Sequence, residues 1–268
     1  MSRAPALTLD FYHDVVCCWC FNISSRMRRL AGEFDLDIRH RTFVLQDNPA
    51  EMRARWGTPA QARETILGHW ATCRRVSDRP HLIDIEALRE AEFDYPHGHT
   101  AALACKAAEA LGGQDAHWTL FDRIQRAHLS EARNVADPSV LAQLGEFAGL
   151  SPGKLAAVMT DPATRRAVEA DRQRARSLQI RSIPTLVVHE TGTRLVNGPL
   201  DDLSAQIRAA IQLNPNRRRI FSMFRTTPRH SEPRRSRRGV PRDLPPHLMR
   251  DIGLEPWPER PIIIPRLW

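Results

Sequence analysis

The chain of 268 residues lacks any apolar run that approaches the ~18 residues of a membrane-spanning helix. Residues 1–5 have no apolar stretch of the kind found in secretory signals, so we expect a cytoplasmic protein with no membrane span. Cysteine is scarce, and its odd total of five excludes a framework built only of paired disulfides. Because stable disulfides are rare in the cytoplasm, any disulfide-forming pair is expected to be transient or catalytic.

Lysine is absent from the last 54 residues, which nevertheless hold the excess positive charge of the chain. Residues 215–268 contain thirteen arginines and five acidic residues, so their net charge of +8 equals that of the whole chain. The first 214 residues are therefore neutral, and ten of the twenty prolines lie in the tail. These counts predict a folded domain over residues 1–214 and a basic, largely disordered extension over 215–268. We expect the tail to bind RNA, DNA or another polyanion weakly and in a salt-dependent way.

Three of the five cysteines lie together, where a predicted strand is followed by a predicted helix. Residues 7–12 alternate apolar and polar side chains, and apolar side chains recur at helical spacing over residues 19–30. Cys17 and Cys20 form a Cys-x-x-Cys pair at the start of this helix. A helix N-terminus stabilises a thiolate, so we expect Cys17 to attack a disulfide and Cys20 to resolve the mixed disulfide.

Other interpretations of the cysteines remain open. Cys17, Cys18 and Cys20 could bind a metal ion together with His13. A second Cys-x-x-Cys pair does not follow along the sequence, and a purely structural disulfide would be unusual at a strand-to-helix junction. We therefore favour redox chemistry without a bound metal. The two cysteines outside the motif are expected to be small buried hydrophobic residues; they are Cys73 and Cys105.

The rest of the sequence alternates between sheet and helix signals. Residues 34–39 predict a second strand, which would complete a parallel βαβ unit with the first strand and helix. Helical signals prevail over about residues 49–177 and predict an insert of about four to six helices. Residues 185–189 and 193–196 then predict a hairpin, and the apolar spacing over 203–211 predicts a last helix.

This order of elements predicts an α/β protein with a thioredoxin-like fold that is interrupted by helices. Its two thioredoxin parts are expected at about residues 6–48 and 178–213. Pro184 precedes the third strand, and in thioredoxin-like folds a proline here has a cis bond and faces the Cys-x-x-Cys pair. We expect the backbone of Ile183 to pair with an extended substrate, and Trp19 to shield the disulfide.

The motifs resemble those of the DsbA-like thioredoxin superfamily, and within it the FrnE-like cytoplasmic branch. The resemblance rests on Asp-Val-Val-Cys-Cys-Trp-Cys at residues 14–20 and on Ile-Arg-Ser-Ile-Pro-Thr at residues 180–185. It covers about residues 6–213 and implies a thiol–disulfide oxidoreductase or disulfide isomerase that acts on protein or small thiol substrates. Cys18 departs from the pattern, because the branch has proline at this position. The residues between two active cysteines tune thiolate stability, so this change affects the redox potential.

A sister branch implies a different activity for the same fold. It contains kappa-class glutathione transferases and 2-hydroxychromene-2-carboxylate isomerases, which share the helical insert but carry serine at the first active position. Cys17 and Cys20 favour disulfide exchange over this chemistry. No resident cofactor is expected, although glutathione could be a co-substrate.

The tail has a resemblance of its own. Residues 247–254 read His-Leu-Met-Arg-Asp-Ile-Gly-Leu, which is similar to the C-terminal signature of small arginine-rich YjiS-like bacterial proteins. This resemblance implies a short helix near residues 244–252.

Overall fold

The structure is a computed structural model that describes residues 5–214. The predicted boundary at residue 214, the polyanion-binding tail and the short helix near residues 244–252 therefore remain predictions, because residues 215–268 lie outside the described part. No helix in the described part is both long and apolar enough to cross a membrane.

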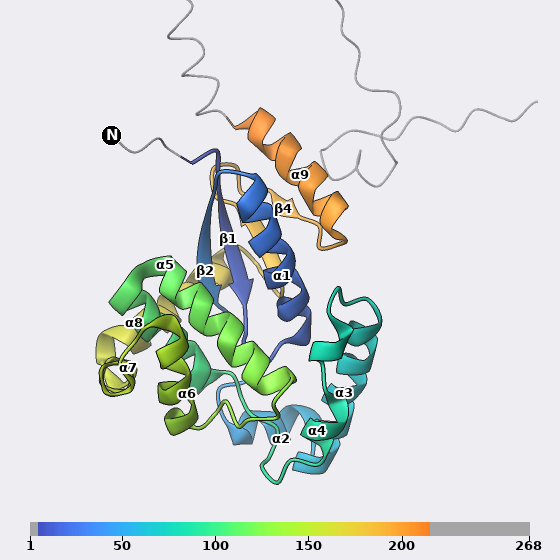
Figure 1. Cartoon of the computed structure of the whole chain (residues 1–268), viewed down its shortest axis with the longest axis vertical. Coiled ribbons are helices and arrows are strands. Elements are labelled where there is room, and N and C mark those ends of the chain that lie inside the picture. Colours follow the sequence, from blue (N-terminus) through green and yellow to red (C-terminus); the bar gives the residue numbers. More distant parts are fainter. Residues whose placement is uncertain (1–4, 215–268) are drawn as a thin grey trace, which may run out of the picture. The chain divides into compact units, whose positions relative to one another are not determined.

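A mixed sheet forms the centre of the described part, with its strands in the order β2-β1-β3-β4 (Figure 1). Strands β1 and β2 are parallel, β3 is antiparallel to β1, and β4 is antiparallel to β3. The strands are β1 (Leu7–His13), β2 (Leu36–Thr42), β3 (Thr185–Val188) and β4 (Arg194–Leu195). This arrangement confirms the predicted thioredoxin-like order of βαβ followed by a hairpin.

Strand β2 begins and ends later than the sequence pattern predicted. Phe34 precedes the strand as the C-cap of the first helix, while His40 and Thr42 belong to the strand and are buried. Polar side chains usually face solvent in a strand, so the alternation rule did not extend the prediction to these positions. His40 is buried because its ring packs against another histidine from β1, which the pattern cannot indicate.

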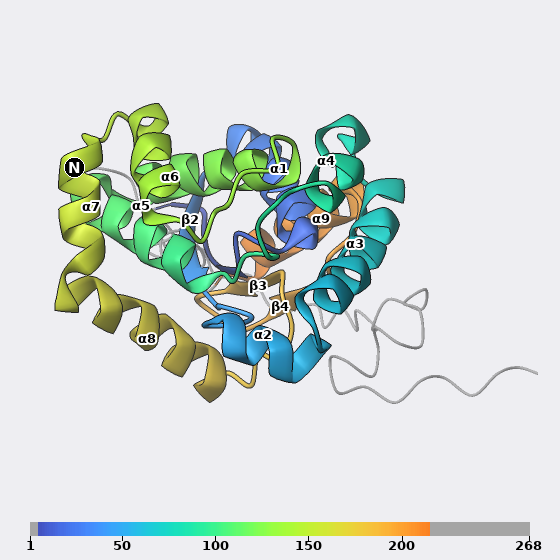
Figure 2. The same ribbon diagram turned by 90° about the horizontal axis from the view of Figure 1, so that it is seen from below.

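Helix α1 (Cys18–Glu33) connects β1 to β2 and contacts α9 (Leu200–Leu213). Between β2 and β3 the described chain forms seven α-helices, more than the predicted four to six. Two of them, with five and seven residues, are too short to show a helical period in the sequence. The seven are α2 (Pro49–Trp56), α3 (Pro59–Arg75), α4 (Ile85–Arg89), α5 (His99–Leu129), α6 (Pro138–Leu144), α7 (Pro152–Thr160) and α8 (Pro162–Ser177). Seen from below, α2, α3 and α5 surround the end of the sheet where α1 begins (Figure 2).

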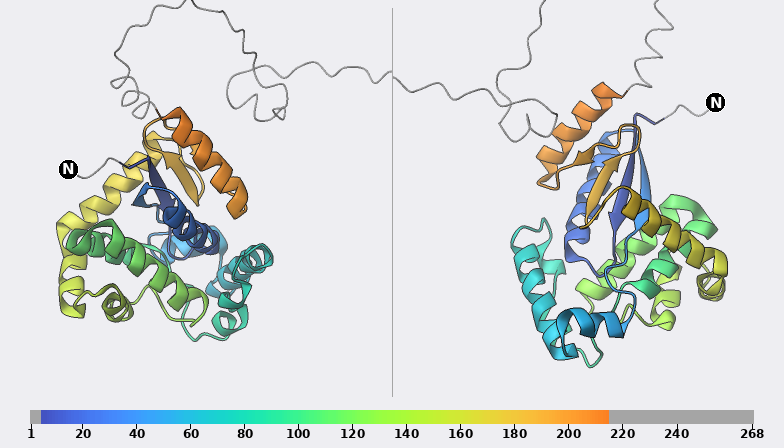
Figure 3. Two further views of the ribbon diagram at one scale, coloured as in Figure 1. Left: turned by 45° about the horizontal axis from the view of Figure 1, so that its top comes forward. Right: turned by 180° about the vertical axis from the view of Figure 1, so that it is seen from behind.

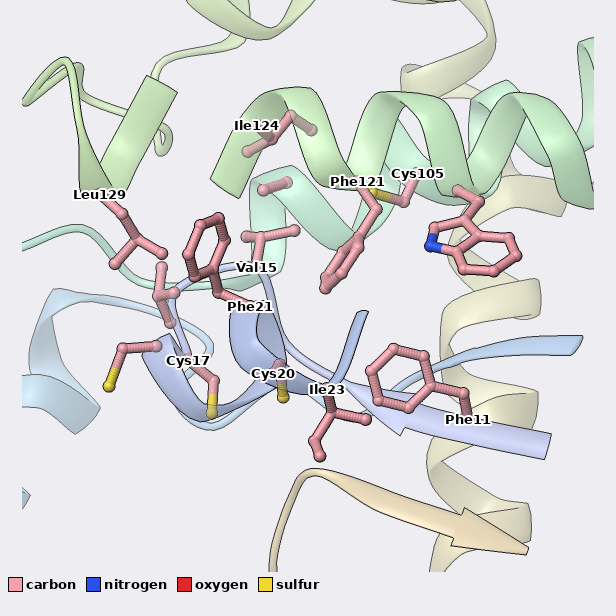
Figure 4. Close-up of a cluster of buried hydrophobic side chains, with 14 of the residues drawn as sticks. Phe11, Val15, Cys17, Cys20, Phe21, Ile23, Cys105, Phe121, Ile124 and Leu129 are labelled. Atoms are coloured by element: carbon pink, nitrogen blue, oxygen red, sulfur yellow. The ribbon is translucent and has the colours of Figure 1, made fainter. Parts of the chain in front are cut away.

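Strand β1 is buried at every position, because helices cover both of its faces. Phe11 points toward α1 and α5, and its ring lies 6.2 Å from the ring of Phe121 (Figure 4). Its neighbour Tyr12 points the other way and packs with Ala175 of α8. Helix α8 lies on the near side in the view from behind (Figure 3). A central strand of this kind has little freedom, so the segment that follows β1 starts from a fixed position.

Candidate active site

Cys17 is the N-cap residue of α1 and follows the short loop after β1. Its backbone is extended, and its carbonyl oxygen accepts hydrogen bonds from the N–H groups of Cys20 at 3.0 Å and Phe21 at 3.4 Å. Cys17 reaches the surface with 8% of its area, whereas Cys20, one turn along, is fully buried. Figure 4 shows both side chains at the start of the helix. Burial, together with a hydrogen bond to Cys17, raises the pKa of the Cys20 thiol well above its usual range. The two thiols therefore lie at the strand-to-helix junction, one near the surface and the other beneath it.

Asp14 anchors the loop between β1 and α1. Its carboxylate accepts hydrogen bonds from the N–H groups of Leu45 at 2.6 Å and Val16 at 3.3 Å. Its backbone carbonyl accepts one from the N–H of Cys17 at 3.2 Å. Burial raises the pKa of Asp14, and the N–H donors oppose this rise. The side chain thus ties the loop that carries Cys17 to the segment after β2.

Side chains from the helical insert bind the carbonyl groups of the same loop. Tyr95 Oη donates a hydrogen bond to the carbonyl oxygen of Val16 at 3.0 Å. Gln125 Nε2 donates to the carbonyl oxygens of Val15 at 3.3 Å and Cys17 at 3.0 Å. Sequence reasoning missed Tyr95 and Gln125, because a polar residue that binds a loop about a hundred positions away leaves no periodic pattern.

Replacing Gly98 with alanine is expected to lower the free energy of unfolding by about 1–3 kcal/mol. Gly98 is the N-cap of α5, and a Cβ atom there would overlap both carboxylate oxygens of Asp14. Its φ of −80° is open to any residue, so the penalty comes from the clash with the anchored loop. Urea denaturation measures the change.

A matched control is Gly68→Ala in the middle of α3, where an added Cβ meets nothing within 4 Å. This change is expected to stabilise the protein by up to about 1 kcal/mol, because alanine favours a helix over glycine. Equal stability of the Gly98→Ala protein and the wild type would contradict a rigid contact between Gly98 and Asp14.

Cys17 opens into a pocket of about 270 Å³, which it shares with Trp19 and Ile183. Trp19 is the more exposed of the two neighbours, with 36% of its area accessible. Aromatic rings from α2, α3 and the segment before α5 form much of the pocket wall. Two guanidinium groups also line the pocket. These residues are Trp56, Trp70, Tyr95, Arg55 and Arg181. The pocket thus combines apolar walls with positive charge beside the Cys17 thiol.

Pro184 lines an adjoining pocket of about 530 Å³, again with Trp19 and Ile183. The peptide bond between Ile183 and Pro184 is cis, as the sequence motif predicted. The side-chain amide of Asn197 donates a hydrogen bond to the carbonyl oxygen of Pro184. The structure therefore brings four of the five predicted site residues to two pockets that share Trp19 and Ile183, and buries Cys20.

Arg26 of α1 lies between the apolar positions of this helix and also lines the larger pocket. The side chain is buried and pairs with Asp78, with 2.8 Å between Nε and Oδ2. Its other nitrogens donate to the carbonyl oxygens of Gly198 at 2.8 Å and Val76 at 3.1 Å. Arg26 therefore joins α1 to the segments after α3 and before α9, a role that depends on tertiary contacts.

Cys18, the departure from the family pattern, lies against a thiol from another helix. It is hydrogen-bonded to Cys73 of α3, and Asn22 Nδ2 donates to Cys73 Sγ at 3.2 Å. The hydrogen bond from Cys18 lowers the pKa of Cys73 and raises that of Cys18. Cys73 is buried as predicted, but it forms part of a second thiol pair beside the motif. Cys105 is fully buried, and burial raises its pKa.

The metal site considered for the motif cysteines with His13 is not assembled in the described part of the chain. Nε2 of His13 lies 3.1 Å from Nδ1 of His40 instead. Within residues 5–214, the side-chain group with metal-binding spacing consists of His13, His40 and His117. The rings of Phe11 and Phe121 lie against His13 and belong to the core.

Structural comparison supports the fold. The cytosolic disulfide reductase DsbM from Pseudomonas aeruginosa is 24% identical, with a TM-score of 0.62 over 77% of this chain and 100% of DsbM. A 2-hydroxychromene-2-carboxylate isomerase has a TM-score of 0.54 at 14% identity, over 80% of this chain and 99% of the isomerase. At such identities the likeness concerns the fold.

Sequence comparison gives the family. The ClpXP adapter protein SpxH from Shouchella clausii is 23% identical over 181 residues, which are 68% of this chain. The match spans only 57% of the adapter, so the activity of that whole protein does not transfer. The profile of the DsbA-like thioredoxin domain matches residues 8–208. This protein belongs to the DsbA-like thioredoxin domain family.

Proposed function

We propose that this protein is a thiol–disulfide oxidoreductase in which Cys17 attacks the substrate and Cys20 resolves the intermediate. The observation that carries the proposal is the contrast between the two thiols. Cys17 caps a helix at a pocket, whereas Cys20 is fully buried one turn below. A buried thiol of raised pKa cannot meet a substrate disulfide directly, but it can reach a sulfur that is already bonded to Cys17.

The proposed reaction moves two electrons from the protein to a disulfide. The Cys17 thiolate attacks one sulfur of the substrate disulfide, which breaks the S–S bond and releases the other sulfur as a thiolate that takes up a proton. Cys20 then loses its proton and attacks the Cys17 sulfur, which releases the second substrate thiol and leaves a Cys17–Cys20 disulfide. Two molecules of glutathione can restore the dithiol and become glutathione disulfide.

We further propose that the protein works in the cytoplasm on protein or small-molecule disulfides, with Trp19, Ile183 and Pro184 binding the substrate. The guanidinium groups of Arg55 and Arg181 at the pocket of Cys17 suit carboxylates, and glutathione carries two of them. A structure of the reductase DsbM, which shares the fold, contains GSH. Its TM-score to this chain is 0.59.

The test is a Cys20→Ser protein incubated with glutathione disulfide or a peptide disulfide. We expect it to accumulate a mixed disulfide on Cys17, visible by mass spectrometry under non-reducing conditions, and to lose catalytic turnover. The matched control is Cys105→Ala, which changes another fully buried cysteine and should turn over like the wild type. A Cys20→Ser protein that forms no adduct while wild type is active would contradict these roles.

A glutathione-dependent isomerase or transferase is the second candidate. It is favoured by the likeness of the fold to a 2-hydroxychromene-2-carboxylate isomerase and by the two arginines at the pocket. Such an enzyme activates glutathione and does not need a resolving thiol. Full turnover of an electrophilic or chromene-type substrate by the Cys20→Ser protein would favour this candidate, whereas loss of turnover would exclude it.

A further inference from the structure

Three buried histidines meet in the core, away from the pockets of the proposed active site. His13 ends β1, His40 lies in β2, and His117 lies in α5. Their exposed areas are 2%, 0% and 0%. Thiol–disulfide exchange does not use any of them. A cluster of polar rings in an apolar core needs a separate explanation, because burying unpaired polar groups is costly.

Hydrogen bonds within the protein satisfy only half of the six ring nitrogens. Nε2 of His13 pairs with Nδ1 of His40 at 3.1 Å, and Nδ1 of His117 pairs with Oε2 of Glu109 at 2.8 Å. The three other ring nitrogens are buried without a partner; they are His13 Nδ1, His40 Nε2 and His117 Nε2. Leaving a buried donor or acceptor unpaired destabilises the folded state. Each of the three rings therefore has one nitrogen that is free to bind a ligand.

The spacing of the rings matches that of three imidazoles around one ion. One nitrogen from each histidine lies within 4.8 Å of the other two. The ring centroids are 5.1 Å apart for His13 and His40, 5.3 Å for His13 and His117, and 4.9 Å for His40 and His117. A tetrahedral zinc ion with Zn–N bonds of about 2.0–2.1 Å sets ligand nitrogens about 3.3 Å apart and ring centres about 5 Å apart. The rings are already at this separation.

The surroundings have one further feature of a metal site, and the nearby cation is balanced by acidic groups. The carboxylate of Glu109 accepts a hydrogen bond from Nδ1 of His117. This carboxylate–histidine arrangement is the one that orients metal-binding imidazoles. Lys106 lies nearby, but its ammonium group is paired with Glu109 at 2.7 Å and with Asp171 at 2.9 Å. The lysine therefore does not leave an unbalanced positive charge beside the cluster.

We propose that His13, His40 and His117 form a binding site for a single Zn²⁺ ion. Imidazole nitrogens are common ligands of zinc, and the zinc ion does not change its oxidation state. The ion would join β1, β2 and α5 one residue before Asp14, which anchors the loop of Cys17. Because Phe11 and Phe121 cover His13, with ring centroids at 4.9 Å and 4.0 Å, the ion has to enter while the chain folds. The site would thus stabilise the framework of the thiol motif without taking part in the exchange.

The experiment uses full-length protein without an affinity tag, unfolded and then refolded with Zn²⁺ or with a chelator. We expect elemental analysis to find a single zinc ion per chain after desalting, and the melting temperature to rise with zinc. Refolding with Co²⁺ is expected to give the visible absorption of tetrahedral cobalt without a thiolate-to-metal charge-transfer band. That band would instead assign the ion to the cysteines and overturn the proposal, as would a wild-type protein that retains no metal.

Zinc binding by single-residue variants shows which side chains hold the ion. His117→Gln is expected to abolish stoichiometric binding, and Glu109→Gln to weaken it by about 10- to 100-fold while all three ligands remain. Glu109 is partly exposed, so its variant should fold even if His117→Gln does not. The matched control is His128→Gln, which removes a fully buried histidine outside the cluster and should leave zinc binding unchanged. Zinc affinity equal to wild type in Glu109→Gln and in folded His117→Gln would overturn the proposal.

Discussion

A Cys17→Ser protein is expected to reduce insulin, or another protein disulfide, no faster than a reaction mixture without protein. Disulfide exchange needs a thiolate that can attack sulfur, and a serine hydroxyl does not ionise at neutral pH. Cys20 cannot replace the missing nucleophile, because it is fully buried and burial raises its pKa. The measurement is the initial rate with glutathione as reductant, compared between wild-type and variant full-length proteins.

The fold of the variant needs its own check, so urea denaturation of Cys17→Ser should accompany the rate. The neighbouring pair of Cys18 and Cys73 supplies an informative control, because these thiols contact each other beside the motif. Activity that survives in Cys17→Ser and is lost in Cys73→Ser would move the nucleophile to this second pair and contradict our assignment.

Acidification from pH 7 to pH 5 is expected to destabilise the protein, with His128 alone contributing about 2 kcal/mol. Burial lowers the pKa of His128 to about 3, while an unfolded histidine has a value of about 6.5. Between these two values the unfolded state binds a proton that the folded state does not bind. Stability from this group is therefore complete above pH 6.5 and is lost as the pH falls below it.

The hydrogen bonds around His128 explain why it stays neutral. Tyr95 Oη uses its proton to bind the carbonyl oxygen of Val16, so it accepts at 3.1 Å from Nε2 of His128. Nδ1 of His128 is buried and has no partner. A second proton on this ring would be a buried charge without compensation, beside the loop that carries Cys17.

A His128→Gln protein isolates this effect, because glutamine retains an N–H donor but cannot take up a proton. Urea denaturation at several pH values should show that its stability falls less steeply than that of wild type, by about 1.4 kcal/mol per pH unit between pH 6 and pH 4. Identical pH dependence of the two proteins would show that folding does not lower the pKa of His128 and would contradict this prediction. The comparison cancels the opposite contributions of Asp14 and Asp122, whose pKa values are raised by burial.

Much of the active-site geometry follows from local patterns in the sequence. The alternation over residues 7–12 and the helical spacing after it predict a strand and a helix, and they place Cys17 at the junction. The start of the third strand likewise places Pro184. Such signals are readable because strand and helix periods involve residues close together in the chain, where backbone geometry alone sets the spacing.

The residues that hold this geometry could not be read in the same way. Tyr95 and Gln125 bind carbonyl groups of the motif loop from about 80 and 110 positions away. Cys73 meets Cys18 across 55 positions, and nothing near it in the sequence marks it as a partner. Polar residues in these positions are as compatible with a solvent-exposed helix as with a buried contact.

The sequence by itself therefore determined the thioredoxin-like order of elements and the place of the thiol pair at a helix N-terminus. Only the tertiary structure decided which side chains anchor the loop, and that His13, His40 and His117 meet in the core. The physical reason is the separation along the chain over which each kind of interaction acts. Hydrogen bonds and periodicity within an element act between near neighbours, whereas burial and ligand spacing arise when elements far apart in the chain pack together.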